Sequence, residues 1–255
     1  MEKLEKIITR LELNAPLSLC EEWDNSGLLV GDKDCMIDKV MVVVDVTMAV
    51  LKEAVEIGAN LIISHHPIIF APIKSITRAT TNGRLILYAV QHGINIYSMH
   101  TNLDSASGGI NSRLAVELGL VERDGKDMCY RTGKIGDEIT FGELVQKVKT
   151  LTGDNTIKTS GNLDEIVERV AIISGAGGRD DDFVQDVILP RNIQVFITAE
   201  VKHSLLLTLV DNNVKLIELG HWTSEKISKN IIYEWLKGLD IQVGMSHQDT
   251  NPYNN

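Results

Sequence analysis

The run Val40-Met-Val-Val-Val-Asp45 constrains the fold more than any other segment of the chain. A continuous series of apolar, mostly β-branched residues is typical of a strand that is buried on both faces. Such strands occur in parallel sheets whose two faces are covered by helices. A helix predicted over residues 48–57 follows, with Thr47 as its N-cap and Gly58 at its end. We therefore expect an α/β fold.

Helix and strand patterns alternate along the rest of the chain. Helices are predicted over residues 2–13, 82–92, 108–118, 140–151, 180–189, 202–210 and 224–238. Strands are predicted over residues 61–63, 94–99, 130–134, 156–159, 167–174, 194–198, 215–219 and 241–246. This alternation predicts two α/β lobes with mixed, largely parallel sheets flanked by helices. A charged stretch over residues 121–128 indicates a boundary, so we assign residues 1–126 and 219–255 to the first lobe and 127–218 to the second.

Composition excludes several classes of protein. The chain has 255 residues, of which 44% are hydrophobic and 24% charged, as in an ordinary globular protein. Its net charge of -10 argues against generic nucleic-acid binding, because that binding relies on Lys and Arg to neutralise phosphates. The first residues lack the apolar region of a signal peptide, and the longest apolar runs are too short to span a bilayer. We therefore expect a cytoplasmic protein that does not bind membranes.

The three cysteines, Cys20, Cys35 and Cys129, show no paired spacing. This scatter argues against both a disulfide framework and a zinc site built from thiolates. Any metal site in this chain must therefore use His, Asp and Glu side chains.

The tripeptide His65-His66-Pro67 follows directly on the strand predicted over residues 61–63. Imidazole is the commonest metal ligand at neutral pH and a frequent general base. Two adjacent imidazoles at the end of a buried strand are an unusual use of residues for a core. From the tripeptide alone, a metal site and a pair of ordinary edge histidines are equal alternatives.

Two further strand ends carry side chains that bind metals. One predicted strand leads to His100 and Asp104, and another leads to His221 and Glu225. The spacing of His221 and Glu225 places both on one face of a helix that begins after the preceding glycine. In parallel α/β sheets, ligands bind beyond the carboxyl ends of the strands. The three strand ends together therefore predict a metal site more strongly than any of them does alone.

The candidate ligands are His65, His66, Asp104, His221 and Glu225. One catalytic zinc usually takes three ligands from the protein, whereas five suit two divalent ions with a bridging carboxylate and open positions for water. Nitrogen and oxygen donors suit Zn, Fe, Mn, Co or Ni, so the metal is left open. His100 is either a catalytic general acid or an outer partner of the ligands, or it is a structural residue.

A glycine-rich turn, Gly175-Ala-Gly-Gly178, joins a predicted strand to a predicted helix. Its amides could cradle an anion, but it lacks the Lys and Ser/Thr of a P-loop and the spaced glycines of a dinucleotide fingerprint. A tight turn that allows close packing is the favoured interpretation.

Four segments carry a family resemblance. They are Glu22-Trp-Asp-Asn-Ser-Gly-Leu-Leu-Val-Gly31, Ser64-His-His-Pro-Ile-Ile-Phe70, Met99-His-Thr-Asn-Leu-Asp-Ser-Ala-Ser-Gly-Gly-Ile-Asn111 and Gly220-His-Trp-Thr-Ser-Glu225. Together they resemble the signature of the GTP cyclohydrolase I type 2 homologues, also called the Nif-three-like family, in its short form. The resemblance implies the same five ligands, two divalent ions per chain in a cleft between the lobes, and assembly into ring-shaped homohexamers.

One segment departs from the family pattern. Relatives usually have Thr-Gly-Asp or Thr-Gly-Glu where this chain has Thr198-Ala-Glu200. A single His203 also stands in the region where paired histidines are common. The five ligand positions are unaffected by this departure.

Two functions fit the residues and the resemblance. The first is a metal-dependent hydrolase, in which two divalent ions activate water against a phosphoester, a cyclic amide or a nucleotide. The second is a non-catalytic, metal-binding, ring-shaped scaffold that binds nucleic acid or partner proteins. The sequence does not identify the small-molecule substrate.

Overall fold

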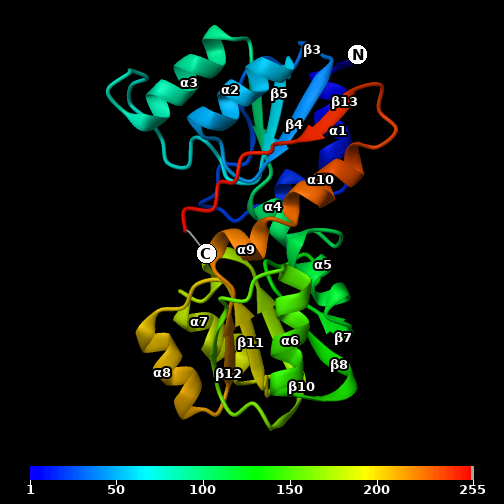
Figure 1. Cartoon of the computed structure of the whole chain (residues 1–255), viewed down its shortest axis with the longest axis vertical. Coiled ribbons are helices and arrows are strands. Elements are labelled where there is room, and N and C mark those ends of the chain that lie inside the picture. The colour runs from blue at the N-terminus through cyan, green and yellow to red at the C-terminus, as the bar shows by residue number, and fades with distance from the viewer. Residues whose placement is uncertain (254–255) are drawn as a thin grey trace. The chain divides into compact units, whose positions relative to one another are not determined.

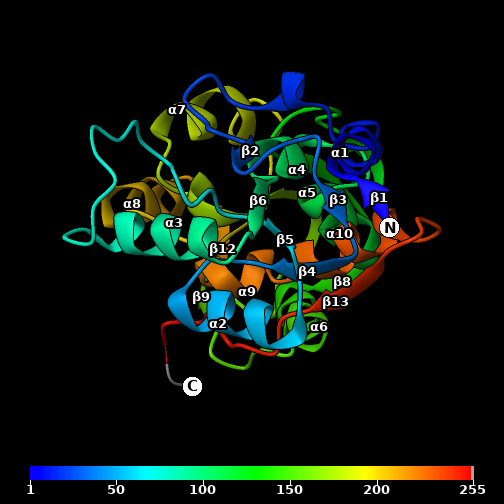
Figure 2. The same cartoon turned by 90° about the horizontal axis from the view of Figure 1, so that it is seen from above.

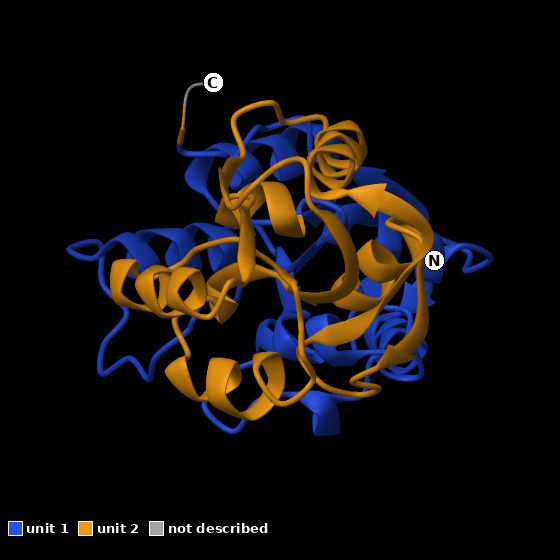
Figure 3. Cartoon of the chain, turned by 90° about the horizontal axis from the view of Figure 1, so that it is seen from below, with its two compact units in different colours: residues 1–109, 226–252 blue, residues 110–225, 253–255 orange. Residues whose placement is uncertain are grey.

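The structure is a computed structural model that describes residues 1–253. The chain divides into two compact units, which Figure 3 colours separately. Unit 1 comprises Met1–Gly109 and Lys226–Pro252, and unit 2 comprises Ile110–Glu225 together with Tyr253. Each unit is a sheet flanked by helices (Figure 1), so the predicted class of two α/β lobes with mixed, partly parallel sheets is confirmed.

Unit 1 is built on a five-stranded sheet with the strand order β13-β4-β5-β6-β2. Four strands are parallel, and β2 runs antiparallel to β6 at one edge. The strands are β2 (Gly27–Val30), β4 (Lys39–Val43), β5 (Leu61–Ser64), β6 (Asn95–Ser98) and β13 (Gln242–Met245), with a separate antiparallel pair of β1 (Glu2–Lys3) and β3 (Met36–Ile37). The helices are α1 (Leu4–Glu12), α2 (Met48–Ile57), α3 (Thr81–Gln91), α4 (Thr101–Ser105) and α10 (Ser228–Leu236), with a 3₁₀ turn at Leu17–Leu19.

Helices cover both faces of the sheet of unit 1 (Figure 1 and Figure 2). On one face, Leu51 of α2 and Ile86 of α3 are buried in a cluster with Ile62 of β5. On the other face, α10 contacts β4 and β13 and packs against α1. The helix α2 has the predicted bounds, because Thr47 accepts a hydrogen bond from a first-turn amide and Gly58 ends the helix at a φ of 72°.

Unit 2 is built on a six-stranded sheet with the strand order β7-β8-β10-β11-β12-β9. Its centre, β10-β11-β12, is parallel, and the other three strands pair antiparallel with their neighbours. The strands are β7 (Leu120–Asp124), β8 (Arg131–Thr140), β9 (Lys158–Ser160), β10 (Ile166–Ile173), β11 (Val195–Thr198) and β12 (Lys215–Glu218). The helices are α5 (Ile110–Glu117), α6 (Phe141–Thr152), α7 (Asp181–Phe183), α8 (His203–Asp211) and α9 (His221–Glu225), with a 3₁₀ turn at Gly175–Gly177.

The helices of unit 2 also lie on both faces of their sheet (Figure 1). Phe183 of α7 and Leu209 of α8 are buried with Phe196 of β11 on one face, while α5 and α6 contact β8 on the other. The capping box predicted at the start of α6 is present, with Thr140 and Glu143 bonding each other's backbone amides. The helix predicted over residues 180–189 is instead split into α7 and a π-helical turn at Val184–Ile188.

The boundaries between the units differ from those drawn from the sequence, at 126/127 and 218/219. The chain enters unit 2 at Ile110 because α5 contacts β8 and β10. Half of the charged stretch over residues 121–128 belongs to β7, an edge strand paired with β8 in the sheet of unit 2. The chain returns to unit 1 only at Lys226, because α9 packs on the Gly175–Gly177 turn of unit 2.

Two features of the surface and the helices complete the fold. Within residues 1–253, every helix is too short or too polar to cross a bilayer.

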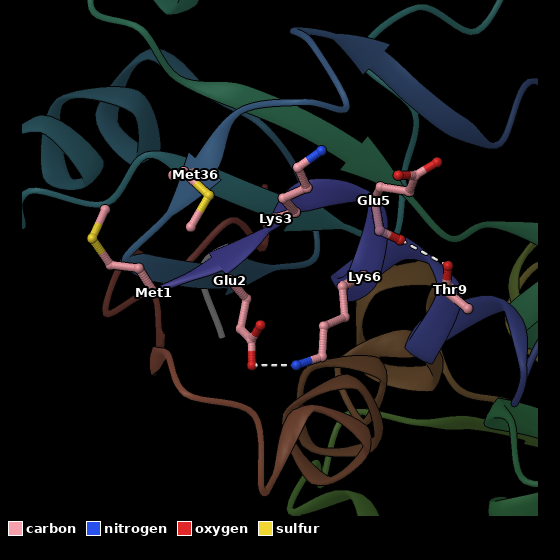
Figure 4. A pocket seen from close by; sticks show the side chains of 7 residues that line it. All are labelled: Met1, Glu2, Lys3, Glu5, Lys6, Thr9 and Met36. Carbon is pink, nitrogen blue, oxygen red and sulfur yellow. Dashed lines mark hydrogen bonds and ion pairs between the residues drawn. The ribbon is translucent and has the colours of Figure 1, made fainter.

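A hollow of about 520 Å³ lies beside the start of α1 (Figure 4), lined by Met1, Glu2, Lys3, Glu5, Lys6, Thr9 and Met36. An ion pair of 2.6 Å between Lys6 and Glu2 belongs to this lining, which includes no histidine.

Candidate metal centre

Three histidines of unit 1 lie together beyond the carboxyl ends of two neighbouring strands. His65 and His66 follow β5, and His100 follows β6, which is parallel to β5. Their ring centroids are 4.9, 5.3 and 5.6 Å apart, and each ring offers a nitrogen within 4.8 Å of the others. Because parallel strands end at the same edge of a sheet, the pairing of β5 with β6 is what brings the three imidazoles together.

The backbone of the His65-His66 corner is held by the neighbouring strand. The amide of His65 donates to the carbonyls of Val43 and Val44 at 3.2 and 3.1 Å, and the amide of His66 donates to Val44 at 3.0 Å. The hydroxyl of Ser64 donates to the carbonyl of His66 at 2.8 Å. The β4–β5 ladder therefore extends into the corner, and both side chains start from a fixed backbone.

His65 is fully buried and lies beside a carboxylate. Its Nδ1 is 2.8 Å from the carbonyl oxygen of Met99, which can only accept, so Nδ1 carries the proton and Nε2 carries the lone pair. A carboxylate oxygen of Asp104, on the short helix α4, lies within 4.8 Å of a ring nitrogen of His65. These two candidate ligands therefore adjoin each other within unit 1.

A carboxylate orients His66 in the same way. Its Nδ1 is 2.7 Å from Oδ1 of Asp45, the residue that ends the apolar run of β4. A carboxylate on Nδ1 fixes the ring, keeps the proton on that nitrogen and raises the basicity of Nε2. This pairing is common for histidines that bind metals.

His100 is held by Asp24, which lies in the loop before β2. Nδ1 of His100 is 2.7 Å from Oδ1 of Asp24, and Oδ2 of Asp24 accepts from the amide and the hydroxyl of Thr101 at 3.0 and 2.6 Å. Burial raises the pKa of Asp24, but the hydrogen bonds and charge of His100 and the bonds from Thr101 outweigh it and hold the pKa well below its usual range. Asp24 is therefore a stable anion beside His100.

Two exposed aromatic rings flank His100. The centroids of Trp23 and Phe70 lie 6.0 and 6.1 Å from that of His100, and 5.8 Å from each other. Trp23 is 60% exposed and Phe70 is 53% exposed. The side-chain amide of Asn25 donates to the carbonyl of Ile69 at 2.5 Å and so ties the two aromatic segments together.

Unit 2 carries a His–Glu pair on a single helical turn. The helix α9 begins at His221, directly after Gly220, whose φ of 81° turns the chain out of β12. Nε2 of His221 is 3.2 Å from a carboxylate oxygen of Glu225, which is 2% exposed. The four-residue spacing thus places both side chains on one helix face, as the sequence predicts.

His221 is oriented by a carboxylate that lies in the segment departing from the family pattern. Its Nδ1 is 3.0 Å from Oε1 of Glu200, two residues beyond β11. The other oxygen of Glu200 is paired with the guanidinium of Arg179. Although Ala199 stands where relatives usually have glycine, the segment still supplies Glu200 as the carboxylate that orients His221.

The glycine-rich turn of unit 2 packs directly on the His–Glu pair. Gly175 has a φ of 61°, and a Cβ added there would lie 2.4 Å from Oε1 of Glu225 and 3.6 Å from Nε2 of His221. Its amide donates to the hydroxyl of Ser224 at 3.1 Å. Close packing, the favoured interpretation of this turn, is what these contacts show.

The structure thus brings the predicted ligands into two sets, one in each unit. His65, His66 and Asp104 lie in unit 1 with His100, and His221 and Glu225 lie in unit 2. Sequence reasoning assigned no orienting role to Asp45, Asp24 or Glu200, although it singled out the segments that carry Asp24 and Glu200. Two of these carboxylates could have been found from their place in the sheet. Asp45 and Glu200 follow parallel strands that are next to the ligand-bearing strands.

The donors fit divalent metal ions. All four imidazoles have Nδ1 at 2.7 to 3.0 Å from a carboxylate or carbonyl oxygen, which leaves Nε2 as the donor nitrogen of each ring. Asp104 and Glu225 add carboxylate oxygens, and both are buried. Imidazole nitrogen with carboxylate oxygen is the ligand set of Zn, Fe, Mn, Co and Ni sites. The metal-binding groups predicted from the sequence are therefore present in both units.

Comparisons with known proteins agree over the whole chain. The model of the family Duf34/NIF3 (NGG1p interacting factor 3) matches residues 2–252. A "GTP cyclohydrolase 1 type 2 homolog" of Clostridium perfringens is 33% identical over 88% of this chain and 87% of its own, and one of Clostridium acetobutylicum is 30% identical over 98% of both. The crystal structure of a hypothetical protein of Staphylococcus aureus superposes with a TM-score of 0.87 at 26% identity, covering 99% of both chains.

Proposed function

The chain belongs to the Duf34/NIF3 family, and on this basis we propose that it is a metal-dependent hydrolase with a dinuclear centre. In this proposal His65, His66 and Asp104 of unit 1 and His221 and Glu225 of unit 2 hold two divalent ions. The substrates that suit such a centre are phosphoesters and cyclic amides or nucleotides.

One observation carries the proposal more than any other. Each of the three candidate histidine ligands has its Nδ1 bound to a fixed oxygen: Met99 for His65, Asp45 for His66 and Glu200 for His221. Surface histidines have no need of this arrangement, whereas histidines that bind metals almost always show it. Three pre-oriented Nε2 atoms beside two buried carboxylates favour metal binding over a purely structural role.

The chemistry divides between the ions and the side chains. Two divalent ions at these ligands would lower the pKa of water and polarise a phosphoryl or carbonyl oxygen. The Asp24 carboxylate keeps the proton of His100 on Nδ1, so its Nε2 is the atom that accepts or returns a proton during bond cleavage. Trp23 and Phe70 flank the His100 ring, where they can contact the substrate and limit access of water.

Metal content tests the first half of the proposal. We expect protein purified without chelators to carry about two divalent ions per chain by elemental analysis. His66→Ala and Glu225→Ala should each lower metal affinity by more than about 100-fold, because even the loss of an orienting partner costs about 10- to 100-fold. His92→Ala, which removes an exposed histidine at the end of α3, is the control and should bind metal normally. Fewer than about one ion per chain would contradict the dinuclear centre.

Turnover tests the second half. Metal-reconstituted protein is assayed against phosphodiesters, phosphomonoesters and nucleotides, with His66→Ala, Glu225→Ala and His92→Ala in parallel. We expect one substrate class to be hydrolysed by the wild type and His92→Ala, and not by the two ligand variants. Equal turnover in all four proteins would overturn the hydrolase. Full metal loading without turnover of any substrate would favour the non-catalytic scaffold.

A further inference from the structure

A segment that follows β13 is hydrogen-bonded to Asp45, the carboxylate that orients the candidate ligand His66. We infer that the strap, defined as residues 246–251, positions the His66 ring, and that Thr250 is the residue through which it does so. The inference rests on the proposed function, because it assigns a positioning residue to the same metal-binding site. The strap is the red segment beyond β13 in Figure 1.

The strap is fixed to the sheet and to a helix. The amide of Ser246 donates to the carbonyl of Val42 at 3.0 Å, which continues the parallel pairing of β13 with β4. The Ser246 hydroxyl donates to Glu53 of α2, and the His247 amide donates to the other oxygen of Glu53 at 2.8 Å. Glu53 is only 8% exposed, so both of its carboxylate oxygens are committed to the strap. Because a buried carboxylate needs hydrogen-bond partners, these bonds from the strap to Glu53 hold the strap on α2.

From this anchor the strap reaches Asp45. The hydroxyl of Thr250 donates to Oδ2 of Asp45 at 2.8 Å, while Oδ1 of Asp45 is 2.7 Å from Nδ1 of His66. The two contacts use different oxygens, so Thr250 and His66 together define the plane of the carboxylate. Local turns support the approach, with the amide of Asn251 donating to Asp249 at 2.9 Å.

The consequence is a chain of three side chains that ends at a candidate ligand. Asp45 is one-third exposed, and its carboxylate is held at both oxygens, by Nδ1 of His66 at Oδ1 and by the hydroxyl of Thr250 at Oδ2. The hydroxyl of Thr250 therefore helps to direct Oδ1 at the imidazole. Partners that orient a ligand in this way tune metal affinity without touching the metal.

Thr250→Val tests the inference, because valine keeps the branched shape and removes the hydroxyl. We expect metal affinity, measured by titration calorimetry with Zn²⁺ and Mn²⁺, to fall about two- to tenfold, less than the about 10- to 100-fold cost of losing an orienting partner outright, because Asp45 itself remains. Thr250→Ser keeps the donor and should restore wild-type affinity. Thr150→Val, which removes a hydroxyl bonded within α6 on the exposed side of that helix, is the matched control.

A measurement on metal-free protein separates this inference from the proposed function. Long-range ¹H–¹⁵N correlation spectra report the proton position on each histidine ring. Thr250→Val should shift the His66 nitrogens toward a mixture of tautomers, and Asp45→Asn should shift them further, while Thr150→Val leaves them in place. This result would support the inference even if the wild type bound no metal. Unchanged His66 nitrogens in Thr250→Val would overturn it, whatever the metal affinity.

Discussion

The ligand sets of the two units are built in different ways. In unit 1, His65, His66 and His100 come from the ends of two parallel strands, so their positions depend on the register of β5 with β6. In unit 2, His221 and Glu225 come from one turn of α9, so their spacing is fixed by helix geometry alone. The same kind of donor set is therefore assembled by long-range pairing in one unit and by local structure in the other.

The supporting contacts differ accordingly. Unit 1 surrounds its imidazoles with hydrogen bonds to Asp24, Asp45 and the Met99 carbonyl. In unit 2, the Glu200 carboxylate orients His221, and the backbone of Gly175 approaches Glu225 closely. Polar contacts thus hold the first set, and packing against a backbone holds much of the second. We therefore expect a side chain added beside Glu225 to weaken metal binding by unit 2. Neutralising an orienting carboxylate should weaken metal binding in either unit.

The largest effect is expected from Gly175→Ala. Its Cβ would stand 2.4 Å from Oε1 of Glu225, and the movable carboxylate must swing away from its position beside His221. We expect metal affinity, measured by calorimetry, to fall by more than about 100-fold, because the variant displaces a candidate ligand itself, whereas losing an orienting partner costs about 10- to 100-fold. The left-handed backbone conformation should also cost about 1–2 kcal/mol of folding free energy.

Gly58→Ala is the control that isolates the packing effect. Gly58 has a φ of 72°, close to that of Gly175, and a Cβ added there meets nothing within 4 Å. Thermal melts should therefore show similar losses of stability in the two variants. Only Gly175→Ala should lose metal affinity, and equal affinity in both would refute the packing role of Gly175.

A smaller effect is expected from neutralising the orienting carboxylates. Asp45→Asn in unit 1 and Glu200→Gln in unit 2 each replace a charged acceptor at Nδ1 with an amide that can present its NH₂ group instead. Each should lower metal affinity about 10- to 100-fold. Glu138→Gln, on an exposed part of β8, provides the control for loss of one negative charge. Loss of affinity in only one of the two variants would show that the units do not share the orienting mechanism.

Most of the helices and strands that carry the two ligand sets could be predicted from the sequence, because strong local patterns determine them. The β-branched run became β4, the Thr47 cap and Gly58 bounded α2, and the Gly220-His221 junction began α9. Strand ends located the candidate ligands, since the carboxyl edge of a parallel sheet is fixed by topology. These signals are short in range and needed no knowledge of tertiary packing.

Other features depended on contacts between distant residues. The unit boundary at Ile110 follows from the packing of α5 on β8 and β10, which no local pattern in residues 108–118 reveals. The pairing of His66 with Asp45 spans 21 residues, and that of His100 with Asp24 spans 76. Neither carboxylate has a spacing motif, so only the sheet order connects them to their histidines. The strand β7 was not predicted, because it is an edge strand whose residues are mostly charged and exposed to solvent.

The smallest effect is expected from Arg179→Gln, which removes the partner of Glu200. The ion pair is exposed, with the Arg179 side chain 61% accessible, and exposed pairs contribute at most about 1 kcal/mol. Metal affinity should therefore fall less than about fivefold, and the loss should vanish near 1 M salt, where the charges are screened. The corresponding loss in Thr250→Val should persist at that salt concentration, because the Thr250 hydroxyl is neutral. Calorimetry of both variants at low and high salt makes the measurement, and a salt-insensitive loss in Arg179→Gln would mean that Arg179 acts through packing instead of charge.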